Sequence, residues 1–557
     1  PMKSLYFDRQ TDLGTTGFGS TLVSARTGNE RTTYFFTVIA IITLAIALMS
    51  YINMSTVRSL DRAKEVGIRK VVGAHRSHLK IQFFMESVLM NLTALIIAIL
   101  VVIILMPYFN EFAQTNFTWA SWFNRSFLMV FGTIFISGVL LSGLYPAFIL
   151  SSFMPIVALK GKINSFASRS PLRKFFVVLQ YAPAIALIVC TIIVYNQLGF
   201  MRNMDVGLEM NKLITIRSAR FLPEGMISRE AEAMFRNELK TISSIASASF
   251  AGNQAGRGLN FTVPFGTDTA KASGIVEFKG SGVDHDFADV FGLKLLAGTP
   301  FTEGIAPMHG DPEKFIRKVL VNETAVKHWG FKRNEDAVSR VLTSTNGSQY
   351  YVQGVLEDFN WASAHKATEP VMLWYTPNNR FMTIRFVPEA DVDDALAQVK
   401  SIYDKLFPED VFHYEFAEDV YNRQYGEDEK FAKLFGIFSG MSILIASLGL
   451  FGLSAFAAER RTREVGIRKV MGANVNQIVS LLSKEFIILV LIAFIVASPV
   501  AWFVMHQWLQ TFAYHIDVDA TPFIMTAIGS ISIAIFTVSL KSMSVANTNP
   551  INTLRTE

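Results

Sequence analysis

The phrase "EVGIRKVVGAH" occupies residues 65–75, and the phrase "EVGIRKVMGAN" occupies residues 464–474. Nine of their first ten residues are identical, and the two copies are 399 positions apart. Each copy follows one long apolar run and precedes two more. A repeat of this kind predicts that the chain contains two copies of one structural unit.

The apolar runs around the phrase are long enough to cross a lipid bilayer, which takes roughly 20 mostly apolar residues as a helix. Of the 557 residues, 51% are hydrophobic and only 17% are charged. Buried helices of a large soluble enzyme could explain one such run but not seven. The sequence therefore predicts a polytopic α-helical membrane protein with seven transmembrane helices, at residues 34–57, 84–106, 127–150, 175–198, 431–457, 486–508 and 523–543.

The loops between these runs alternate in charge. Residues 58–80 hold seven basic and two acidic side chains, and residues 151–174 and 458–484 are also rich in Lys and Arg. Residues 107–125 and 507–522 are not. Because cytoplasmic loops of membrane proteins carry an excess of Lys and Arg, the basic loops are expected in the cytoplasm. The long segment between the fourth and fifth runs then lies on the outer side.

This outer segment contains short runs rich in Val, Ile, Tyr and Phe, separated by Gly, Pro and Asn, as is typical of β-strands. The runs are residues 212–219, 317–322, 350–356, 370–375 and 381–387. Helical patterns lie between them, at residues 230–239, 323–329 and 392–406. The sequence predicts a large mixed α+β extracytoplasmic domain. Since no low-complexity linker separates it from the flanking helices, its motions could be passed to them directly.

The repeat also sets the expected domain boundaries. They are a first three-helix unit at 33–160, a cytoplasmic linker at 161–174, a helix at 175–199 that opens the second half, the outer domain at 200–430 and a second three-helix unit at 431–557. A helix and an outer domain precede the second unit, whereas the chain opens at "PMKSLYFDRQ" some thirty residues before its first run. Residues 1–32 are therefore interpreted as the end of a truncated first outer region. A natural short form that starts near Met2 is the alternative.

The repeated phrase has the pattern of a short amphipathic helix on the cytoplasmic surface. An acid stands four residues before an Arg in both copies, the better order for a helical side-chain pair. Each copy also carries a small apolar face, formed by Ile68, Val71 and Val72 or by Ile467, Val470 and Met471. An anchor for lipid headgroups would require only such a composition. The same residues in the same order suggest instead a surface for a duplicated partner.

Longer stretches around the phrase resemble a known family. The stretch "AFAAERRTREVGIRKVMGANVNQIVSLLSKEF" (455–486) is similar to the signature of the FtsX/MacB-like permeases of ABC transporters. In the outer segment, "GLKLLAG" (292–298), "VNETAVKHWGF" (321–331) and "GVLEDFNWASAHKATEP" (354–370) resemble the MacB-like extracytoplasmic core domain. "LRKFFVVLQYAPAIALIVCTIIVYNQL" (172–198) resembles the helix that opens the second half of two-copy members.

The resemblance implies a permease subunit in the bacterial cytoplasmic (inner) membrane, with residues 200–430 outside. Its partner would be a separate cytoplasmic ABC ATPase that dimerises on ATP and engages both phrases. The coupling role is carried onto Glu65, Gly67, Arg69, Lys70 and Gly73 and onto Glu464, Gly466, Arg468, Lys469 and Gly472. Membrane lipids are further partners, there is room for a periplasmic or outer-membrane protein, and no nucleic acid is expected.

Two carboxylates, Glu86 and Glu485, lie near the cytoplasmic starts of their spans. Ionisable groups in or near a membrane are usually paired. A salt bridge to the basic phrase would steady the junction between phrase and helix. A carboxylate exposed among lipid headgroups is the alternative.

The sequence contains no motif that indicates an enzyme. The chain has no G-x-x-x-x-G-K-[ST] phosphate-binding loop, and with one cysteine and no H-E-x-x-H it does not suggest zinc. The cluster "DHDFAD" from Asp284 is interpreted as a solvated loop, and nothing near His365 and Glu369 completes a ligand set. No catalytic activity, cofactor or metal is expected in this chain, since ATP would be bound by the partner.

Two classes of function remain. The first is export or extraction of a hydrophobic, peptide or lipid-linked substrate from the outer side of the membrane, with ATP-driven motion transmitted to the outer domain. The second is control of an outer partner, such as a cell-wall hydrolase, by the same motion without transport. Substrate that raises ATP hydrolysis would indicate the first class, and a partner bound to the outer domain would indicate the second.

Overall fold

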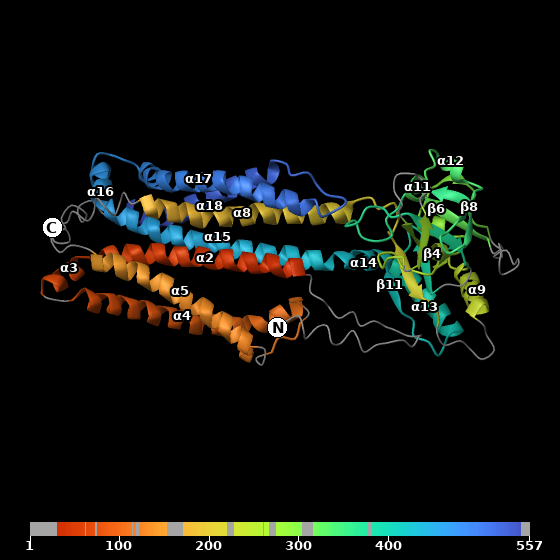
Figure 1. Ribbon diagram of the computed structural model, residues 1–557, viewed down its shortest axis with the longest axis horizontal. Helices are drawn as coiled ribbons and strands as arrows, with labels where there is room; N and C mark the ends of the chain where they lie inside the picture. Colours follow the sequence, from red (N-terminus) through yellow and green to blue (C-terminus); the bar gives the residue numbers. More distant parts are fainter. Residues whose placement is uncertain are drawn as a thin grey trace.

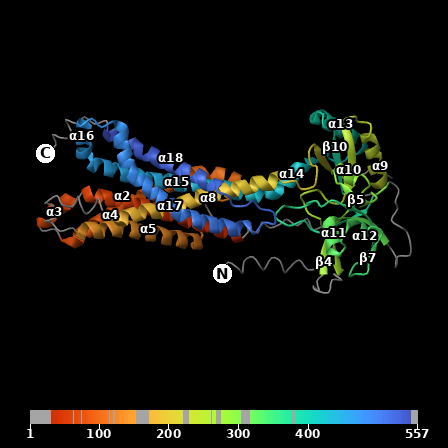
Figure 2. The same ribbon diagram turned by 90° about the horizontal axis from the view of Figure 1, so that it is seen from above.

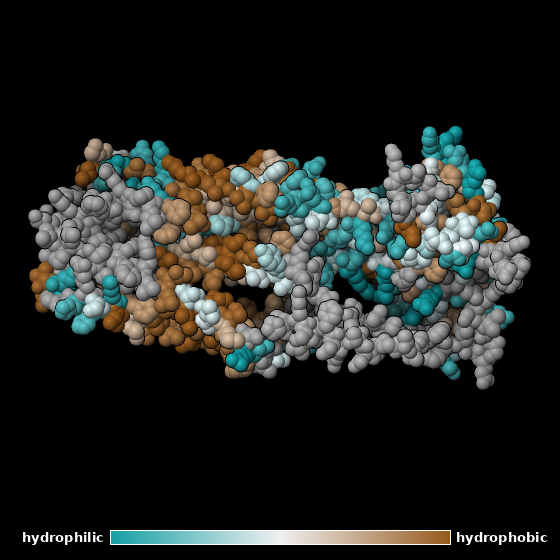
Figure 3. All heavy atoms as spheres, in the orientation of Figure 1, coloured by the Kyte–Doolittle hydropathy of each residue, from teal (hydrophilic) through white to brown (hydrophobic). Residues whose placement is uncertain are grey.

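The computed structural model describes residues 30–61, 63–72, 75–113, 115–118, 122–152, 171–219, 228–259, 261–266, 275–302, 316–376 and 380–546. These residues form an elongated molecule with a bundle of long helices at one end and a β-rich head, residues 213–425, at the other (Figure 1). The same separation is visible from above in Figure 2. Hydrophobic residues cover the bundle, whereas much of the head surface is hydrophilic (Figure 3).

The bundle contains one long helix for each of the seven predicted runs. They are α2 (Glu30–Asp61), α4 (Arg76–Ala113), α5 (Arg125–Ser152), α8 (Pro171–Asn203), α15 (Gly426–Arg460), α17 (Val475–Leu509) and α18 (Thr521–Ala546). Within the described residues, six of them are long and apolar enough to cross a membrane, and α5 contributes a shorter apolar stretch, Phe127–Leu141. The predicted class of polytopic helical membrane protein is confirmed.

Small side chains let the central helices of the bundle approach closely, as is usual where helices pack within a membrane. Ala184 of α8, Ala446 of α15, Ala493 of α17 and Ala534 of α18 are all fully buried in one core cluster. Because α8 packs against both α15 and α17, the second unit is built around the helix that leads to the head.

Helices α2 and α15 run side by side and occupy equivalent places in the two units (Figure 1). Thr43 Oγ1 lies 3.2 Å from Ser442 Oγ, and these two residues are 399 positions apart, the spacing of the repeat. Ser50 and Gly449 have the same spacing, and a Cβ on Gly449 would lie 3.0 Å from Ser50 Oγ. Residues on a twofold axis contact their own equivalents. A pseudo-twofold axis therefore passes between α2 and α15.

The head contains an eleven-stranded mixed sheet in the order β11-β1-β10-β2-β4-β9-β6-β8-β5, with β3 on β4 and β7 on β8. The strands are β1 (Leu213–Arg217), β2 (Ile245–Ala251), β3 (Phe261–Gly266), β4 (Ile275–Val283), β5 (Leu295–Gly298), β6 (Ile316–Asn322), β7 (Val341–Thr343), β8 (Gln349–Leu356), β9 (Val371–Tyr375), β10 (Phe381–Phe386) and β11 (Tyr414–Phe416). β4 pairs with β9, and β6 with β8, in parallel, and the other pairs are antiparallel. The predicted mixed α+β domain is confirmed.

The helices of the head lie in two groups beside this sheet. α9 (Ser228–Leu239) and α13 (Val392–Leu406) pack on β1, β2 and β10, with Phe235 and Tyr403 in their shared core. α11 (Glu323–His328) and α12 (Asn334–Ala337) pack on β6 and β8. Of two further short helices, α14 (Ala417–Asn422) lies at the bundle side of the head (Figure 1), and α10 (Phe287–Val290) contributes Phe287 and Val290 to the core that the head shares with the bundle. The 3₁₀ turn η3 (Arg423–Tyr425) joins α14 to α15.

The interpretation of "DHDFAD" as a solvated loop is wrong for its first residue. Asp284 is 1% exposed and accepts hydrogen bonds from Ser249 Oγ at 2.6 Å and from the backbone N–H of Phe250 at 2.8 Å. It also pairs with Arg236 of α9. The end of β4 brings this carboxylate against β2 and α9, a neighbourhood that the local sequence does not indicate. Within the described residues, no group of three or more His, Cys, Asp or Glu could hold a metal ion.

A second carboxylate, that of Glu232 on α9, lies beside the buried pair of Asp284 and Arg236. Burial, opposed by the nearby Arg236, raises the pKa of Glu232 to about 7. Burial also raises the pKa of Asp286, again against the attraction of neighbouring cations. Asp284 and Asp286 thus connect the end of β4 to α9 through Arg236, whereas burial disfavours the ionised form of Glu232.

Candidate coupling sites

Both repeated phrases form nine-residue helices at the end of the bundle farthest from the head (Figures 1 and 2). These are α3 (Ala63–Val71) and α16 (Thr462–Val470). The Arg69 guanidinium lies 2.6 Å from Glu65 Oε1, and that of Arg468 lies 2.8 Å from Glu464 Oε1. The predicted acid–base pair is thus present in both copies, with its side chains about half exposed.

Each phrase is attached to the bundle by the valine that follows its glutamate. Val66 is 2% exposed and packs with Leu79 of α4, while Val465 is 3% exposed and packs with Ile478 of α17. The predicted apolar face does not pack on the bundle. Its members stay exposed in both copies, most of all Val72 at 82% and Met471 at 81%. The phrases therefore present two matching surfaces, each with aliphatic and basic side chains.

The glycines of the phrases differ in what the structure describes of them. Gly67 lies within α3 and Gly466 is buried within α16, whereas Gly73 lies outside the described residues. Gly472 has a φ of +93° and follows Met471, the C-cap residue of α16. The backbone N–H groups of Gly472 and Ala473 return to the carbonyls of Lys469 and Arg468, at 3.1 and 2.9 Å. This is the Schellman arrangement that ends helices at glycine, so Gly472 sets where the exposed surface stops.

The two junction carboxylates lie in different surroundings. Glu485 Oε1 lies 2.9 Å from Lys174 Nζ of α8, and its Oε2 lies 3.3 Å from Arg461, at the corner between α15 and α16. This one side chain therefore connects three helices. Glu86 is exposed on α4. Lys70 and Lys469 are half-buried on α3 and α16.

At the opposite end of the bundle, the helices and the head share one hydrophobic core. It contains Val194 of α8, Phe435 of α15 and Met505 of α17 together with Phe291 and Trp361 of the head. His365 belongs to the loop between β8 and β9, residues 357–370, which we name the junction loop. Its Nε2 lies 2.9 Å from Asp428 Oδ2 of α15. This contact could not be predicted from local sequence, because Asp428 lies 63 positions from His365.

An apolar cavity of about 440 Å³ lies between α2, α8, α15 and α17. Its wall includes Phe35, Ile42, Ala186, Phe435, Ala501 and Trp508. Aromatic side chains, among them the stacked pair of Phe431 and Trp508, lie at its head-side end. Because the cavity is lined almost wholly by apolar groups, it suits a hydrocarbon chain better than water.

The two membrane units match one family model. The model of the FtsX-like permease C-terminal domain matches residues 37–155 and 436–550. Both matched segments are therefore FtsX-like permease domains. The two matched segments begin 399 positions apart, the spacing that also relates Thr43 to Ser442 on the pseudo-twofold axis. In this permease, the family domain therefore occurs twice.

Part of this FtsX-like permease also resembles larger proteins. It is 30% identical over 140 residues to the macrolide export ATP-binding/permease protein MacB of Campylobacter jejuni subsp. jejuni, a match that covers 25% of this chain and 21% of the relative. It is 30% identical over 137 residues to the MacB of Pasteurella multocida, covering 23% and 20%. The chain thus spans about a fifth of the length of the curated relatives it matches.

Two solved structures resemble the outer part of the permease at low similarity. The periplasmic region of MacB from Actinobacillus actinomycetemcomitans covers 40% of this chain and 96% of its own, with 14% identity and a TM-score of 0.26. The extracellular domain of the noncanonic ABC-type transporter YknZ from Gram-positive bacteria covers 36% and 98%, with 12% identity and a TM-score of 0.24.

Proposed function

We propose that this chain is the permease subunit of an ABC transporter in the bacterial inner membrane. A separate cytoplasmic ATPase would bind both repeated phrases, and its nucleotide cycle would move the head on the outer side. ATP would be bound and hydrolysed by that partner, with no catalytic step in this chain. Glu65, Gly67, Arg69, Lys70 and Gly73, with Glu464, Gly466, Arg468, Lys469 and Gly472, would form the two coupling surfaces.

One observation supports this proposal most directly. The same exposed surface of aliphatic and basic side chains occurs twice at one end of the bundle, on either side of a pseudo-twofold axis. Two equivalent surfaces related by such an axis fit a partner that is itself a symmetric dimer. A lipid anchor would require neither the matching residue order nor the matching exposure of Val72 and Met471.

The transported substrate would be hydrophobic, peptide-like or lipid-linked. The apolar cavity supports this class, since it lies among the helices next to the shared core of bundle and head. A strongly charged substrate would lose its hydration there without compensation. Control of an outer partner without transport would use the same coupling surfaces and leave the cavity unexplained.

The coupling assignment can be tested by reversing charge in both phrases, with Arg69→Glu and Arg468→Glu together. We expect the P-loop ATPase that co-purifies with the unmodified chain from its native membranes to be lost from the double variant. Arg333→Glu is a matched control, because Arg333 is an exposed arginine that pairs locally with Glu335 in the head. Undiminished ATPase binding by a correctly inserted double variant would contradict the proposal.

Transport and regulation can be separated with the reconstituted complex in proteoliposomes. Transport predicts that a lipopeptide or another apolar substrate raises ATP hydrolysis, and that Ala186→Trp, which fills the cavity, abolishes this stimulation while basal hydrolysis continues. Stimulation that persists in the filled variant would exclude the cavity as the substrate site. ATP-dependent activation of an outer hydrolase, with no substrate moved, would favour regulation.

A further inference from the structure

In the part of the chain that the structure describes, two chain crossings connect the head to the bundle. α8 leads into β1, and η3 leads into α15. Two connections alone would leave the head free to rotate about the line that joins them. A third, noncovalent attachment away from that line would remove this freedom. The loop between α17 and α18, residues 510–520, makes such an attachment at the junction loop.

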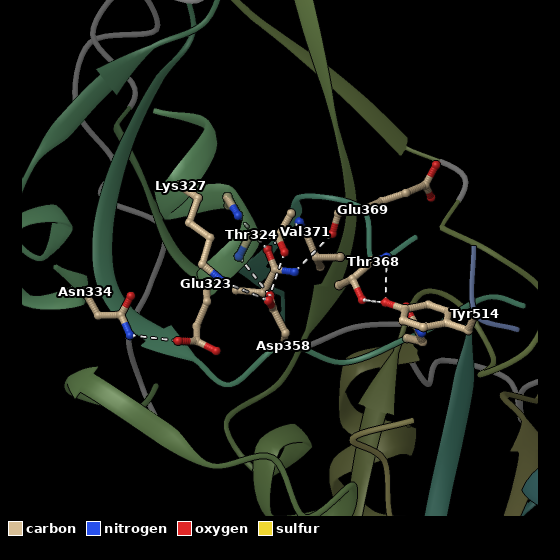
Figure 4. A network of polar contacts seen from close by, with 12 residues as sticks. Glu323, Thr324, Lys327, Asn334, Asp358, Thr368, Glu369, Val371 and Tyr514 are labelled. Carbon is tan, nitrogen blue, oxygen red and sulfur yellow. Dashed lines mark hydrogen bonds and ion pairs between the residues drawn. The ribbon is translucent and has the colours of Figure 1, made fainter. Parts of the chain in front are cut away.

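The α17–α18 loop contacts the junction loop through three kinds of interaction. The ring of Phe512 stacks on the imidazole of His365, with centroids 4.8 Å apart. The backbone N–H of Ala513 donates to the carbonyl of His365 at 3.2 Å. The hydroxyl of Tyr514 lies 2.9 Å from Thr368 Oγ1 and accepts the N–H of Thr368 at 3.3 Å (Figure 4).

Helix α15 and the two elements that precede it, α14 and η3, contact the same short loop. Tyr425 accepts a hydrogen bond from the N–H of Ala364 at 3.1 Å, and its side chain is fully buried. Tyr421 donates to the carbonyl of Ala362 at 2.7 Å. His365 completes the set through Asp428 at 2.9 Å. The junction loop thus receives contacts from α15, which flanks the apolar cavity, and from the loop that follows α17.

The third helix is connected through Gln197 of α8, which is fully buried. Its Nε2 donates to the carbonyl of Tyr514 at 2.9 Å, and its Oε1 accepts the N–H of Ile516 at 2.9 Å. A buried amide with both ends bonded is costly to disconnect. The α17–α18 loop is therefore held against α8 while it holds the junction loop.

On its other side, the junction loop is fastened within the head. Asp358 accepts hydrogen bonds from the N–H and the hydroxyl of Thr324, at 2.8 and 2.9 Å (Figure 4). Asn322, also fully buried, accepts from the N–H of Val371 and donates to the carbonyl of Glu369, at 2.9 and 3.0 Å. Trp361 is buried among Phe287 and Phe291. A displacement of the loop must therefore move the sheet with it.

We propose that the junction loop is the transmission element of this permease, with His365 and Thr368 as the positioning residues through which α15 and the α17–α18 loop move the head. This inference rests on the proposed function for its driving force. Its structural part, a third attachment that makes the head follow the bundle, stands on the contacts alone.

The structural part can be measured without an ATPase, by hydrogen exchange on the full chain in lipid nanodiscs. One variant combines Thr368→Val with Tyr514→Phe, which removes two hydroxyls at nearly constant volume. A second is His365→Phe, which keeps an aromatic ring against Phe512 but loses the bond to Asp428. We expect exchange at the N–H groups of Thr368 and Ala513 to rise roughly fivefold or more in the first variant, the loss of protection that one hydrogen bond confers.

The matched control is Lys366→Ala, which changes an exposed side chain of the same loop. Exchange at Thr368 and Ala513 should not change in this control. Unchanged exchange in both test variants would overturn the inference, whatever the chain transports.

The functional part is measured in the complex with the co-purifying ATPase. Spin labels at Lys327→Cys in the head and Gln507→Cys on α17, in a Cys190→Ser background, report the distance between head and bundle. In the parent, ATP should shift this distance. In both test variants, ATP hydrolysis should continue while at least half of the shift is lost.

An equal shift in parent and variants would overturn the transmission role. If exchange responds as expected but ATP moves the head in no protein, the proposed function fails and the third attachment stands. The two failures are therefore distinguishable.

Discussion

The two halves of the bundle contain the same sequence pattern, but matched residues are equally exposed in one part of it and differently exposed in another. Along the two phrases, the matched residues whose exposure the structure describes are nearly equally exposed, from Val66 and Val465 to Val72 and Met471. The helices that follow them differ. In the most apolar stretch of α4 no residue is buried, whereas 28% of the matching stretch of α17 is.

The physical reason lies in what each helix contacts. The buried valine of each phrase packs against residues of its own unit, Leu79 of α4 in one copy and Ala458 of α15 with Ile478 of α17 in the other. Similar sequences therefore give similar surfaces. α17 packs against α8 and α18, while α4 packs against α5. Burial of a spanning helix is thus decided by elements elsewhere in the chain. The phrases match because their side chains are exposed in both copies, whereas α4 and α17 differ because their burial depends on which helices pack against them.

The largest effect is expected on the axis between the halves. A Cβ on Gly449 would lie 2.6 Å from Gln180 Nε2 and 3.0 Å from Ser50 Oγ. Gly449→Leu should therefore push α2 away from α15 and lower the free energy of unfolding by about 3 kcal/mol or more. Gly440→Leu on the same helix is the control, because a Cβ there meets nothing within 4 Å. Thermal unfolding of the purified chain measures the unfolding midpoint of both variants. Equal midpoints would show that α2 and α15 do not approach closely at Gly449.

The next prediction compares substitutions at equivalent positions of α17 and α4. Ala493 is fully buried in the core cluster that contains Ile185 of α8, and its equivalent Ala94 is exposed on α4. Ala493→Leu should overpack the core and cost about 2 kcal/mol, while Ala94→Leu should be tolerated. The readout is again the unfolding midpoint. A comparable loss from Ala94→Leu would mean that α4 is buried in the working protein.

A smaller effect tests whether the two phrases are equivalent. Arg69 and Arg468 are matched in exposure and in their local acid partner. Each single charge reversal should weaken ATPase binding to a similar extent, by roughly fivefold or about 1 kcal/mol. Titration of the ATPase onto nanodisc-bound chain gives both dissociation constants. A large difference between the two variants would show that one phrase dominates.

The smallest effect concerns the carboxylate at the helix junction. Glu485→Gln removes the charge that pairs with Lys174 and Arg461, but all three side chains are partly exposed. Pairs of this kind contribute little, so the expected loss of unfolding free energy is about 0.5 kcal/mol. Unfolding in low and high salt is the check, since the loss should shrink as salt screens the pairs. A loss of several kcal/mol would indicate a structural role far beyond a surface pair.

Local pattern was enough to predict much of the fold. The helical pattern at 392–406 coincides with α13, and the five predicted strands are β1, β6, β8, β9 and β10. Strands β2 ("IASASFA") and β4 ("IVEFKGSGV") were missed, because Ser, Ala and Gly weaken the pattern of alternating bulky residues. Both are held by neighbours on the sheet, β10 and β9.

The two candidate sites also differ in whether the sequence could predict them. The coupling phrases could be found in the sequence because a duplicated surface leaves a duplicated string. The junction loop could not, since His365 meets Asp428 and Phe512 only after the head folds against the bundle. Nothing repeats, and no spacing rule connects His365 to Asp428, 63 positions away, or Thr368 to Tyr514, 146 positions away.

The sequence by itself determined that the chain crosses a membrane several times and that it carries one short phrase twice. Both follow from short-range properties, hydrocarbon length and residue order, which need no knowledge of neighbours. Only the tertiary structure decided that Thr43 meets Ser442 on an axis, and that Asp284 is buried. It alone decided that α15 and the α17–α18 loop meet at one loop of the head. These contacts arise from close packing of distant segments, whose geometry is set by the whole fold rather than by any local stretch.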